Sequence, residues 1–196
     1  MLEKTPIKNM YDLDVPLIFT DGTDFFKKLS KEYIVHETGF FILAPSGAGK
    51  THYINHQKVR NWIDGDMLWE GANAHPRPGW WLENNDVIKR VDTQSDIITV
   101  QAKKLGFWVM GASNNWLRPD AIVLPHWTTH KKYIKYRENN NYDGGAKSDN
   151  FDQVLGHRNV IESWAKKGVP KFKSIEEAAD YLAEQKNNQK GETQNE

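Results

Sequence analysis

Short apolar segments alternate with longer amphipathic ones along most of the chain. The segments 40–43, 61–64, 107–110 and 121–124 predict buried strands, and 168–172 predicts a short fifth strand. Between and after them, helices are predicted over residues 50–58, 85–105, 128–138 and 174–184. Because strands that alternate with helices pair in parallel through right-handed crossovers, we expect an α/β fold. It would have three layers: a five-stranded parallel sheet and helices on both faces.

The flanks of this pattern differ from its centre. Residues 1–33 predict an N-terminal extension, with a short strand at 17–19 and a helix over 23–33. Residues 34–182 predict the main domain, whose last helix opens with a capping box of Ser174 and Glu177. An Asn- and Gly-rich loop at 139–150 predicts the tip of a lid over about 128–158. Residues 183–196 are polar and predict a frayed tail.

Composition narrows the classes of protein. The length of 196 residues suits one α/β domain with a sizeable core. Cysteine is absent, which excludes disulfides, thiolate metal sites and thiol catalysis. The 26 acidic and 26 basic residues balance, so the chain as a whole has no positive field to attract long nucleic acids. A local basic region, which also suits a solvated helix face, contains Lys131, Lys132, Lys135, Arg137, Lys147 and Arg158.

Two further classes of site are not expected. No stretch is apolar over the width of a bilayer, and the first residues lack the apolar core of a secretory signal. We therefore expect a cytoplasmic protein without a membrane partner, in the host cytoplasm if the chain is viral. The pairs His52 with His56 and His126 with His130 lack the H-E-x-x-H glutamate and a third ligand, so no zinc is expected.

The first predicted strand leads into a turn that matches G-x-x-x-x-G-K-[ST], the Walker A pattern, except that Ala44 replaces the first glycine. Glycines in such a turn let successive N–H groups point at an anion. The residues expected to cradle phosphates are Ser46, Gly47, Ala48 and Gly49. Lys50 is expected to reach the β- and γ-phosphates of ATP, and the Thr51 hydroxyl to ligate Mg²⁺.

The carboxylates that follow decide between the classes of Walker protein. The third and fourth predicted strands do not end in the acid with which motor ATPases hold Mg²⁺, and the N-K-x-D motif of GTPases is absent. The second strand ends in Asp64-Gly65-Asp66. With the Walker turn, this cluster resembles the small P-loop kinases, which include adenylylsulfate, shikimate and gluconate kinases. The resemblance covers about residues 33–182 and continues in the segments 118–124, 133–137 and 174–182.

The resemblance implies an ATP- and Mg²⁺-dependent phosphotransferase. Asp64 is implied to orient or deprotonate the acceptor hydroxyl or to bind Mg²⁺, and Asp66 can exchange roles with it; the structural alternative is a cap on the next turn. Arg137 and Arg158 flank the loop and are expected to clamp the transferred phosphate when it closes. The loop that follows Phe172 is implied to touch the adenine.

The acceptor is expected to be a nucleoside, nucleotide or nucleic-acid component, including a polynucleotide end or a modified viral base. Trp80 and Trp81 either stack on that base or pack in the core. The full set of residues expected at the acceptor is Asp66, Arg77, Trp80, Trp81, Arg118 and His126. Two alternatives remain open: a kinase of a small polar metabolite such as a sugar acid, and a non-catalytic switch that binds ATP.

Overall fold

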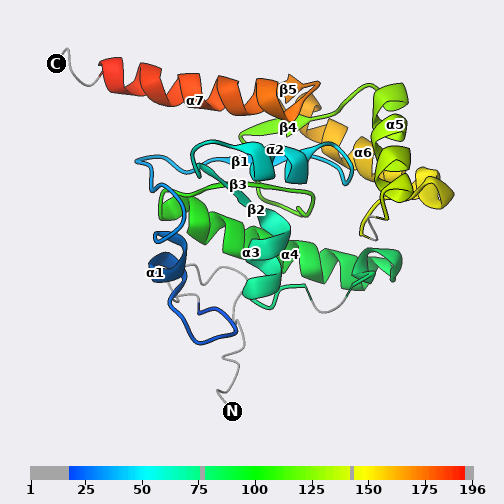
Figure 1. Cartoon of the computed structure of the whole chain (residues 1–196), viewed down its shortest axis with the longest axis horizontal. Coiled ribbons are helices and arrows are strands. Elements are labelled where there is room, and N and C mark those ends of the chain that lie inside the picture. Colours follow the sequence, from blue (N-terminus) through cyan, green and yellow to red (C-terminus); the bar gives the residue numbers. More distant parts are fainter. Residues whose placement is uncertain (1–17, 76–77, 142–143, 193–196) are drawn as a thin grey trace.

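Five strands form a single sheet at the centre of the molecule (Figure 1). The computed structural model describes residues 18–75, 78–141 and 144–192, with side chains as far as residue 186. The strands are β1 (Phe41–Leu43), β2 (Trp62–Asp64), β3 (Trp108–Gly111), β4 (Ala121–Val123) and β5 (Lys171–Phe172). All neighbouring pairs are parallel, in the order β2-β3-β1-β4-β5. The predicted α/β class and five-stranded parallel sheet are therefore confirmed.

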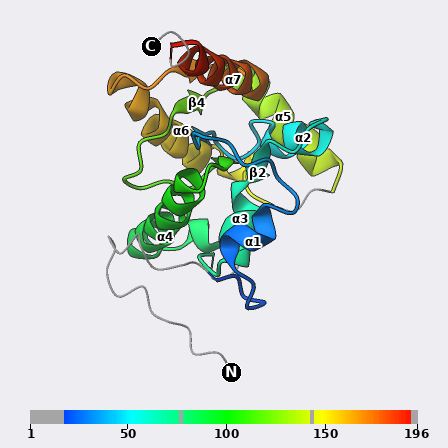
Figure 2. The same ribbon diagram turned by 90° about the vertical axis from the view of Figure 1, so that its left-hand side faces the viewer.

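Helices cover both faces of this sheet (Figures 1 and 2). Residues of α1, α3, α4 and α6 pack in the apolar cluster on one face, and residues of α2 and α7 in the cluster on the other. None of these helices, over the described ranges, has the length and apolarity of a bilayer span. Their bounds are α1 (Phe25–Leu29), α2 (Lys50–His56), α3 (Gly65–Gly71), α4 (Asn85–Lys104), α5 (Trp127–Asn139), α6 (Phe151–Lys166) and α7 (Ile175–Glu192). Two short 3₁₀ helices are η1 (Trp80–Leu82) and η2 (Ser148–Asn150).

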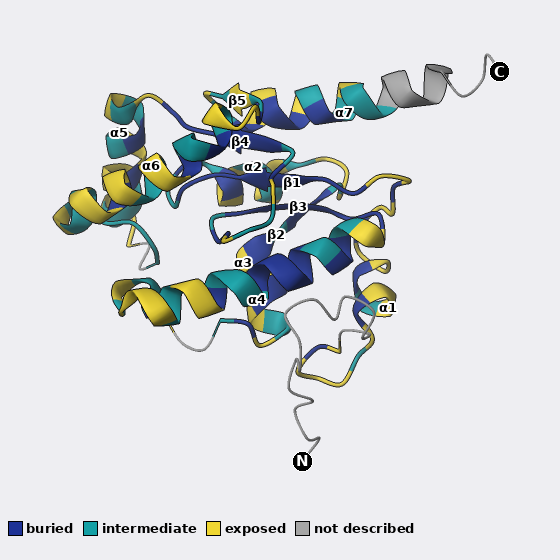
Figure 3. Cartoon of the chain, turned by 180° about the vertical axis from the view of Figure 1, so that it is seen from behind, coloured by how far each residue is buried: buried dark blue, intermediate teal, exposed yellow. Residues whose placement is uncertain are grey.

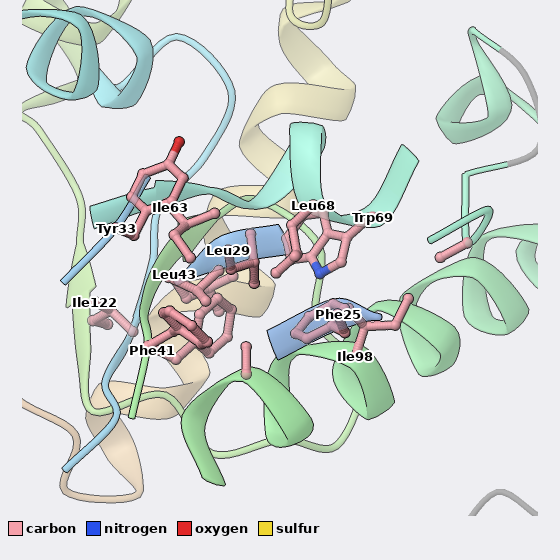
Figure 4. Packing of buried hydrophobic residues seen from close by; sticks show 14 of the residues in the cluster. Phe25, Leu29, Tyr33, Phe41, Leu43, Ile63, Leu68, Trp69, Ile98 and Ile122 are labelled. Carbon is pink, nitrogen blue, oxygen red and sulfur yellow. The ribbon is translucent and has the colours of Figure 1, made fainter. Parts of the chain in front are cut away.

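Strand β1 shows why the two faces are both apolar. Successive side chains of a strand point to opposite faces. Phe41 and Leu43 lie in the first cluster, which Figure 4 shows from close by, and Ile42 lies in the second. All three are buried, as expected for a strand covered by helices on both sides. Figure 3 shows the same concentration of buried residues in the sheet and along α4.

The described part of the N-terminal extension belongs to the core. Phe19, Phe25, Leu29 and Tyr33 are buried in the first cluster, against the sheet and α4 (Figure 4). The strand expected at 17–19 is only an isolated bridge from Ile18 to Asp24, and residue 17 lies outside the described residues. The reason is local, because the Asp24 side chain accepts the N–H of Lys27 and starts α1.

The region expected to form a lid, about 128–158, contains α5, the loop after it and the first half of α6. His130 and Ile134 of α5 are fully buried, and so is most of Val154 of α6. Farther along α6, Ile161 and Trp164 are buried in the first cluster. The polar tail differs from the prediction, because α7 continues to Glu192.

The strand order places a topological switch point beside β1. The connection after β1 runs toward β2 on one side, whereas the connection after β4 runs to β5 on the other. Ligands of open α/β sheets bind outside the carboxyl ends of strands at such a switch point. The Walker turn follows β1 and α5 follows β4, so both lie at this switch point.

Candidate functional site

The Walker turn leaves β1 at the switch point and is shaped by two glycines. The Ala44 N–H donates to the carbonyl of the last residue of β3 at 2.9 Å, which extends the strand pairing into the turn. Gly47 and Gly49 follow with φ angles of 83° and 103°, which residues with a Cβ rarely adopt. The Ala48 N–H donates to the Pro45 carbonyl at 3.2 Å and is thus engaged within the turn.

Lys50 begins α2, and its ammonium group folds back over the turn. Nζ lies 3.0 Å from the carbonyl oxygens of both Ala44 and Pro45, and only 7% of the residue is exposed. Burial lowers the pKa of Lys50, whereas the charges of Asp66 and Asp64 raise it. An ammonium group has three donors, so the two carbonyls leave one N–H for a phosphate oxygen.

Two carboxylates lie at the end of β2, on the same edge of the sheet. Asp64 is the N-cap of α3, and its Oδ1 accepts the Asp66 N–H at 3.0 Å. Burial and then the charge of Asp66 raise the pKa of Asp64, whereas Lys50 lowers it. The capping role that the sequence left open is therefore present. It uses one carboxylate oxygen and is compatible with a metal or acceptor role for the other.

The oxygen ligands suit a nucleotide-bound magnesium ion better than a metal held by protein alone. In the part of the chain that the structure describes, no group of three His, Cys, Asp or Glu side chains is arranged around a metal position. Mg²⁺ at phosphates commonly takes one or two protein ligands and completes its shell with phosphate oxygens and water. Thr51, exposed at the start of α2, and Asp64 are the residues that fit this role.

Helix α5 packs against the Walker turn through a buried histidine. His130 has Nε2 2.7 Å from the Ser46 carbonyl oxygen and Nδ1 2.9 Å from Nη1 of Arg158. Because a guanidinium group only donates, Nδ1 accepts and Nε2 carries the proton that is donated to Ser46. Burial lowers the pKa of His130 to about 4, which keeps this ring neutral.

The loop after α5 also rests on Ser46. The Ala146 N–H donates to the Ser46 hydroxyl at 3.0 Å. Arg137 joins the same contact, with Nη1 3.4 Å from that hydroxyl and Nη2 2.6 Å from the Gly144 carbonyl. Gly145 lies so close that an added Cβ would be 2.1 Å from Ser46 Oγ. The structure thus brings Arg137 to the Walker turn.

The guanidinium group of Arg158 is engaged by residues that flank the Walker turn. Its Nη2 donates to the Pro125 carbonyl at 2.8 Å, and its guanidinium carbon lies 5.6 Å from the centre of the Trp127 ring. With Nη1 on His130, both ends of the guanidinium are engaged. In this conformation Arg158 orients His130, which differs from the phosphate clamp that the sequence predicted.

Two residues expected at the acceptor lie elsewhere. Arg118 precedes β4, and its Nη1 donates to the carbonyl of Lys167, which precedes β5. Because the strands are parallel, both belong to the amino edge of the sheet, opposite the Walker turn. The structure contradicts the acceptor role of Arg118 on this ground. Trp80 is 7% exposed and packs against His75 and Trp81, so it is a core residue and offers no face for stacking.

The other predicted contacts lie nearer to the carboxyl edge. Trp81 is half-buried, and His126 is exposed just before α5. Phe172 ends β5, half-buried, with its ring 5.1 Å from that of Tyr181. A Cβ on Gly49 would lie 4.0 Å from the first residue of α7, so the loop after Phe172 passes the Walker turn. Arg77 lies outside the described residues.

Sequence reasoning missed a pair of acids on α4. Asp96 is fully buried, and its Oδ2 accepts three backbone N–H groups at 2.6–3.0 Å, those of Asn115, Trp116 and Leu117. Asp92 accepts the Ser113 hydroxyl, and burial raises the pKa of Asp92 to about 7. Their spacing of four residues on the apolar side of a predicted helix was the available signal. They fix the loop that follows β3.

A second overlooked residue is His157 of α6. Its ring hydrogen-bonds to the Ala112 carbonyl, and burial followed by the charge of Lys50 lowers its pKa to about 4. His157 is therefore a neutral side chain that lies near Lys50. No local pattern in the sequence distinguishes it.

Comparison with known proteins adds no family to this geometry. No protein-family model matches the chain, and no curated protein matches it. Lys50, Asp64 and Arg137, gathered at the carboxyl edge of one parallel sheet, are therefore the features on which a function is proposed.

Proposed function

We propose that the chain is an ATP- and Mg²⁺-dependent kinase that transfers the γ-phosphate to a hydroxyl or phosphate of a nucleoside, nucleotide or nucleic-acid component. The observation that carries the proposal is the buried Lys50 ammonium, held inside a turn with two left-handed glycines. Asp64, Asp66 and Arg137 each act on its pKa, so four charged groups converge there. Such convergence at a switch point supports phosphoryl transfer, which depends on positioning and charge.

Lys50, Mg²⁺ and Arg137 would each bind or neutralise the phosphates. Lys50 has one N–H left for a phosphate oxygen, and Mg²⁺, held by Thr51 and, where Asp66 is the base, by Asp64, would supply charge neutralisation on the phosphates. Arg137 carries five donors in a planar fork, and in this structure it uses part of them on Gly144 and Ser46. Turning the fork toward the transferred phosphate would give charge-assisted hydrogen bonds where negative charge is concentrated.

Asp64 is the proposed acceptor of the hydroxyl proton. The acceptor oxygen forms a bond to the γ-phosphorus while the bond to the β–γ bridging oxygen breaks and ADP leaves. The hydroxyl proton passes to the Asp64 carboxylate. Burial and the charge of Asp66 raise the pKa of Asp64, which makes its carboxylate a stronger base. Asp66 is the alternative base on the same edge.

A base in the acceptor is supported by an aromatic residue at the start of α5. Trp127 lies at the carboxyl end of β4, with Nζ of Lys131 5.5 Å and the Arg158 guanidinium carbon 5.6 Å from its ring centre. The ring centres of Trp127 and Phe151 lie 5.3 Å apart in a T-shaped arrangement, which restricts the indole. A rigid indole flanked by cations favours a base joined to phosphate over a sugar acid.

The test uses γ-labelled ATP with pools of nucleosides, nucleotides, oligonucleotides and sugar acids. We expect label in a base-containing acceptor, and a loss of about 100-fold or more in Lys50→Ala with cooperative unfolding retained. Lys58→Ala, which removes an exposed lysine shortly after α2, is the matched control and should keep full transfer. Full activity of Lys50→Ala would reject the proposal. Label in sugar acids alone would favour the metabolite kinase, and ATP binding without transfer would favour the switch.

A further inference from the structure

Helix α5 presents tyrosine and lysine side chains on the side that faces away from the protein. Tyr133 is 46% and Tyr136 69% exposed, and Lys132 and Lys135 between and beside them are exposed as well. We call these four residues the α5 tyrosine–lysine face. Tyr133 and Tyr136 are the exposed tyrosines among the residues that the structure describes. Two such rings on one helix, interleaved with cations, need an explanation beyond solubility.

The opposite side of α5 contacts the Walker turn. His130 bonds to Ser46, and a Cβ on Gly47 would lie 2.9 Å from the Ile134 side chain. A helix turns by about 100° per residue, so Tyr133 lies about 60° and Tyr136 about 120° around the axis from His130, in the same direction. The two rings therefore form a path that leads outward from the Walker turn along one flank of α5.

Lys132 and Lys135 present their charged groups to solvent. Across the described ranges, no carboxylate forms an ion pair with Lys132 or Lys135. Glu138 is the acid on α5, and it accepts the N–H and the hydroxyl of Ser148 at 2.7 Å each; the charge of Lys135 acts on it without an ion pair. Although the whole chain is neutral, this surface is locally positive.

We propose that the α5 tyrosine–lysine face binds single-stranded nucleic acid and guides its end to the Walker turn. The inference rests on the proposed function, because it identifies the acceptor as a strand and not a free nucleoside. Lys132 and Lys135 would neutralise backbone phosphates, and the rings of Tyr133 and Tyr136 would stack on successive bases. Stacking requires unpaired bases, so a duplex would bind less well. An acidic peptide would use the lysines but gain little from two rings.

The test measures binding without ATP, by fluorescence anisotropy of labelled oligothymidylate of about 12 nucleotides, at several salt concentrations. For Lys132→Ala with Lys135→Ala we expect weaker binding, and a slope of log affinity against log salt that is smaller by about 1.4. Tyr136→Ser should weaken binding about tenfold, whereas Tyr136→Phe keeps the ring and should restore it. Tyr133→Ser and Tyr133→Phe should repeat this pattern.

The matched control is Lys31→Ala with Lys104→Ala. It also removes two exposed lysines, but next to α1 and at the end of α4, at the other end of the molecule from α5 (Figure 1). Equal weakening by this control, binding of duplex as tight as of single strand, or no binding by the wild type would each overturn the inference. Preference for the same sequence as DNA or as RNA supports it and identifies the sugar.

Failure of this inference and failure of the proposed function give different results. If the face does not bind strands but the kinase proposal is right, γ-label still enters nucleosides or nucleotides. If the face is right and the kinase proposal is wrong, oligonucleotide binding depends on Tyr136 while no label is transferred. Concentration-dependent dimerisation that is lost in Tyr136→Ser, without oligonucleotide binding, would assign the face to a second copy of the chain and overturn the inference.

Discussion

Nε2 of His130 lies 2.7 Å from the carbonyl oxygen of Ser46, across 84 residues of sequence. The bond joins the helix after β4 to the turn after β1, on the two sides of the switch point. The other ring nitrogen accepts Arg158 of α6, so one imidazole links three separate segments. A neutral ring in one tautomer is required, since each nitrogen has a fixed partner.

The stability contributed by His130 should depend on pH. Its pKa is lowered from 6.5 to about 4 by burial, so below about pH 6.5 the unfolded chain binds a proton that the folded chain does not. This contribution is present above pH 6.5 and is lost as the pH falls through 4; it corresponds to about 3 kcal/mol. We expect the difference in unfolding free energy between wild type and His130→Gln to narrow over this range, measured by urea unfolding.

The pH dependence of wild-type stability does not isolate His130, because the contribution of Asp92 to stability changes with pH in the opposite direction. The pKa of Asp92 is raised from 3.8 to about 7, so its contribution falls as the pH rises through that range. Both proteins contain Asp92, and its contribution cancels in the difference. A difference that stays constant between pH 7 and pH 4 would show that His130 is not a buried neutral ring.

Two glycine substitutions should change stability in opposite directions. Gly145 has a φ of 75°, and its Cβ would meet Ser46 Oγ at 2.1 Å, so Gly145→Ala should destabilise by about 1–3 kcal/mol. Gly156 lies within α6 with nothing within 4 Å of an added Cβ, so Gly156→Ala should stabilise by about 0.5–1 kcal/mol. Urea unfolding checks both. Unchanged or raised stability of Gly145→Ala would mean that the loop does not rest on Ser46 in solution, whereas a loss in Gly156→Ala would mean that the space beside Gly156 is not open.

The elements that could be predicted are those with local signals. The strands before the Walker turn and after α4 are uninterrupted apolar runs, which a sheet covered on both faces requires. The two glycines next to Lys50 mark a turn whose φ angles other residues rarely adopt. The position of Asp64 at the carboxyl edge of the sheet could be predicted because Asp64 ends an apolar strand. These features depend on a few neighbouring residues, and the structure reproduces them.

What the sequence did not predict depends on distant contacts. The apolar positions of α6, Val154, Ile161 and Trp164, are spaced too widely to form a clear helical stripe, and the polar loop before them favoured a lid. Arg118 was expected near the Walker turn, although it precedes a strand and such a residue lies at the amino edge of a parallel sheet. His130 acquires its role only from a residue 84 positions away.

Asp96→Asn should destabilise the protein by about 2 kcal/mol or more. One carboxylate oxygen accepts three backbone N–H groups, and an amide brings an NH₂ group and no charge to that position. Asp86→Asn is the matched control, because it makes the same change at an exposed site in the first turn of α4 and should cost less than about 1 kcal/mol. Equal losses in thermal or urea unfolding would contradict the role given to Asp96.

Asp64→Asn separates the structural role of this residue from its proposed chemistry. Asparagine is as good an N-cap as aspartate, so α3 and the unfolding free energy should change little, whereas Asp64→Ala should lose about 1 kcal/mol. The amide cannot take a proton, so Asp64→Asn should keep its ATP affinity and lose about 100-fold or more in turnover. Asp66→Asn makes the same change two residues away. If Asp66→Asn alone lowers turnover, the hydroxyl proton passes to Asp66 and the half-buried Asp64 is only a cap.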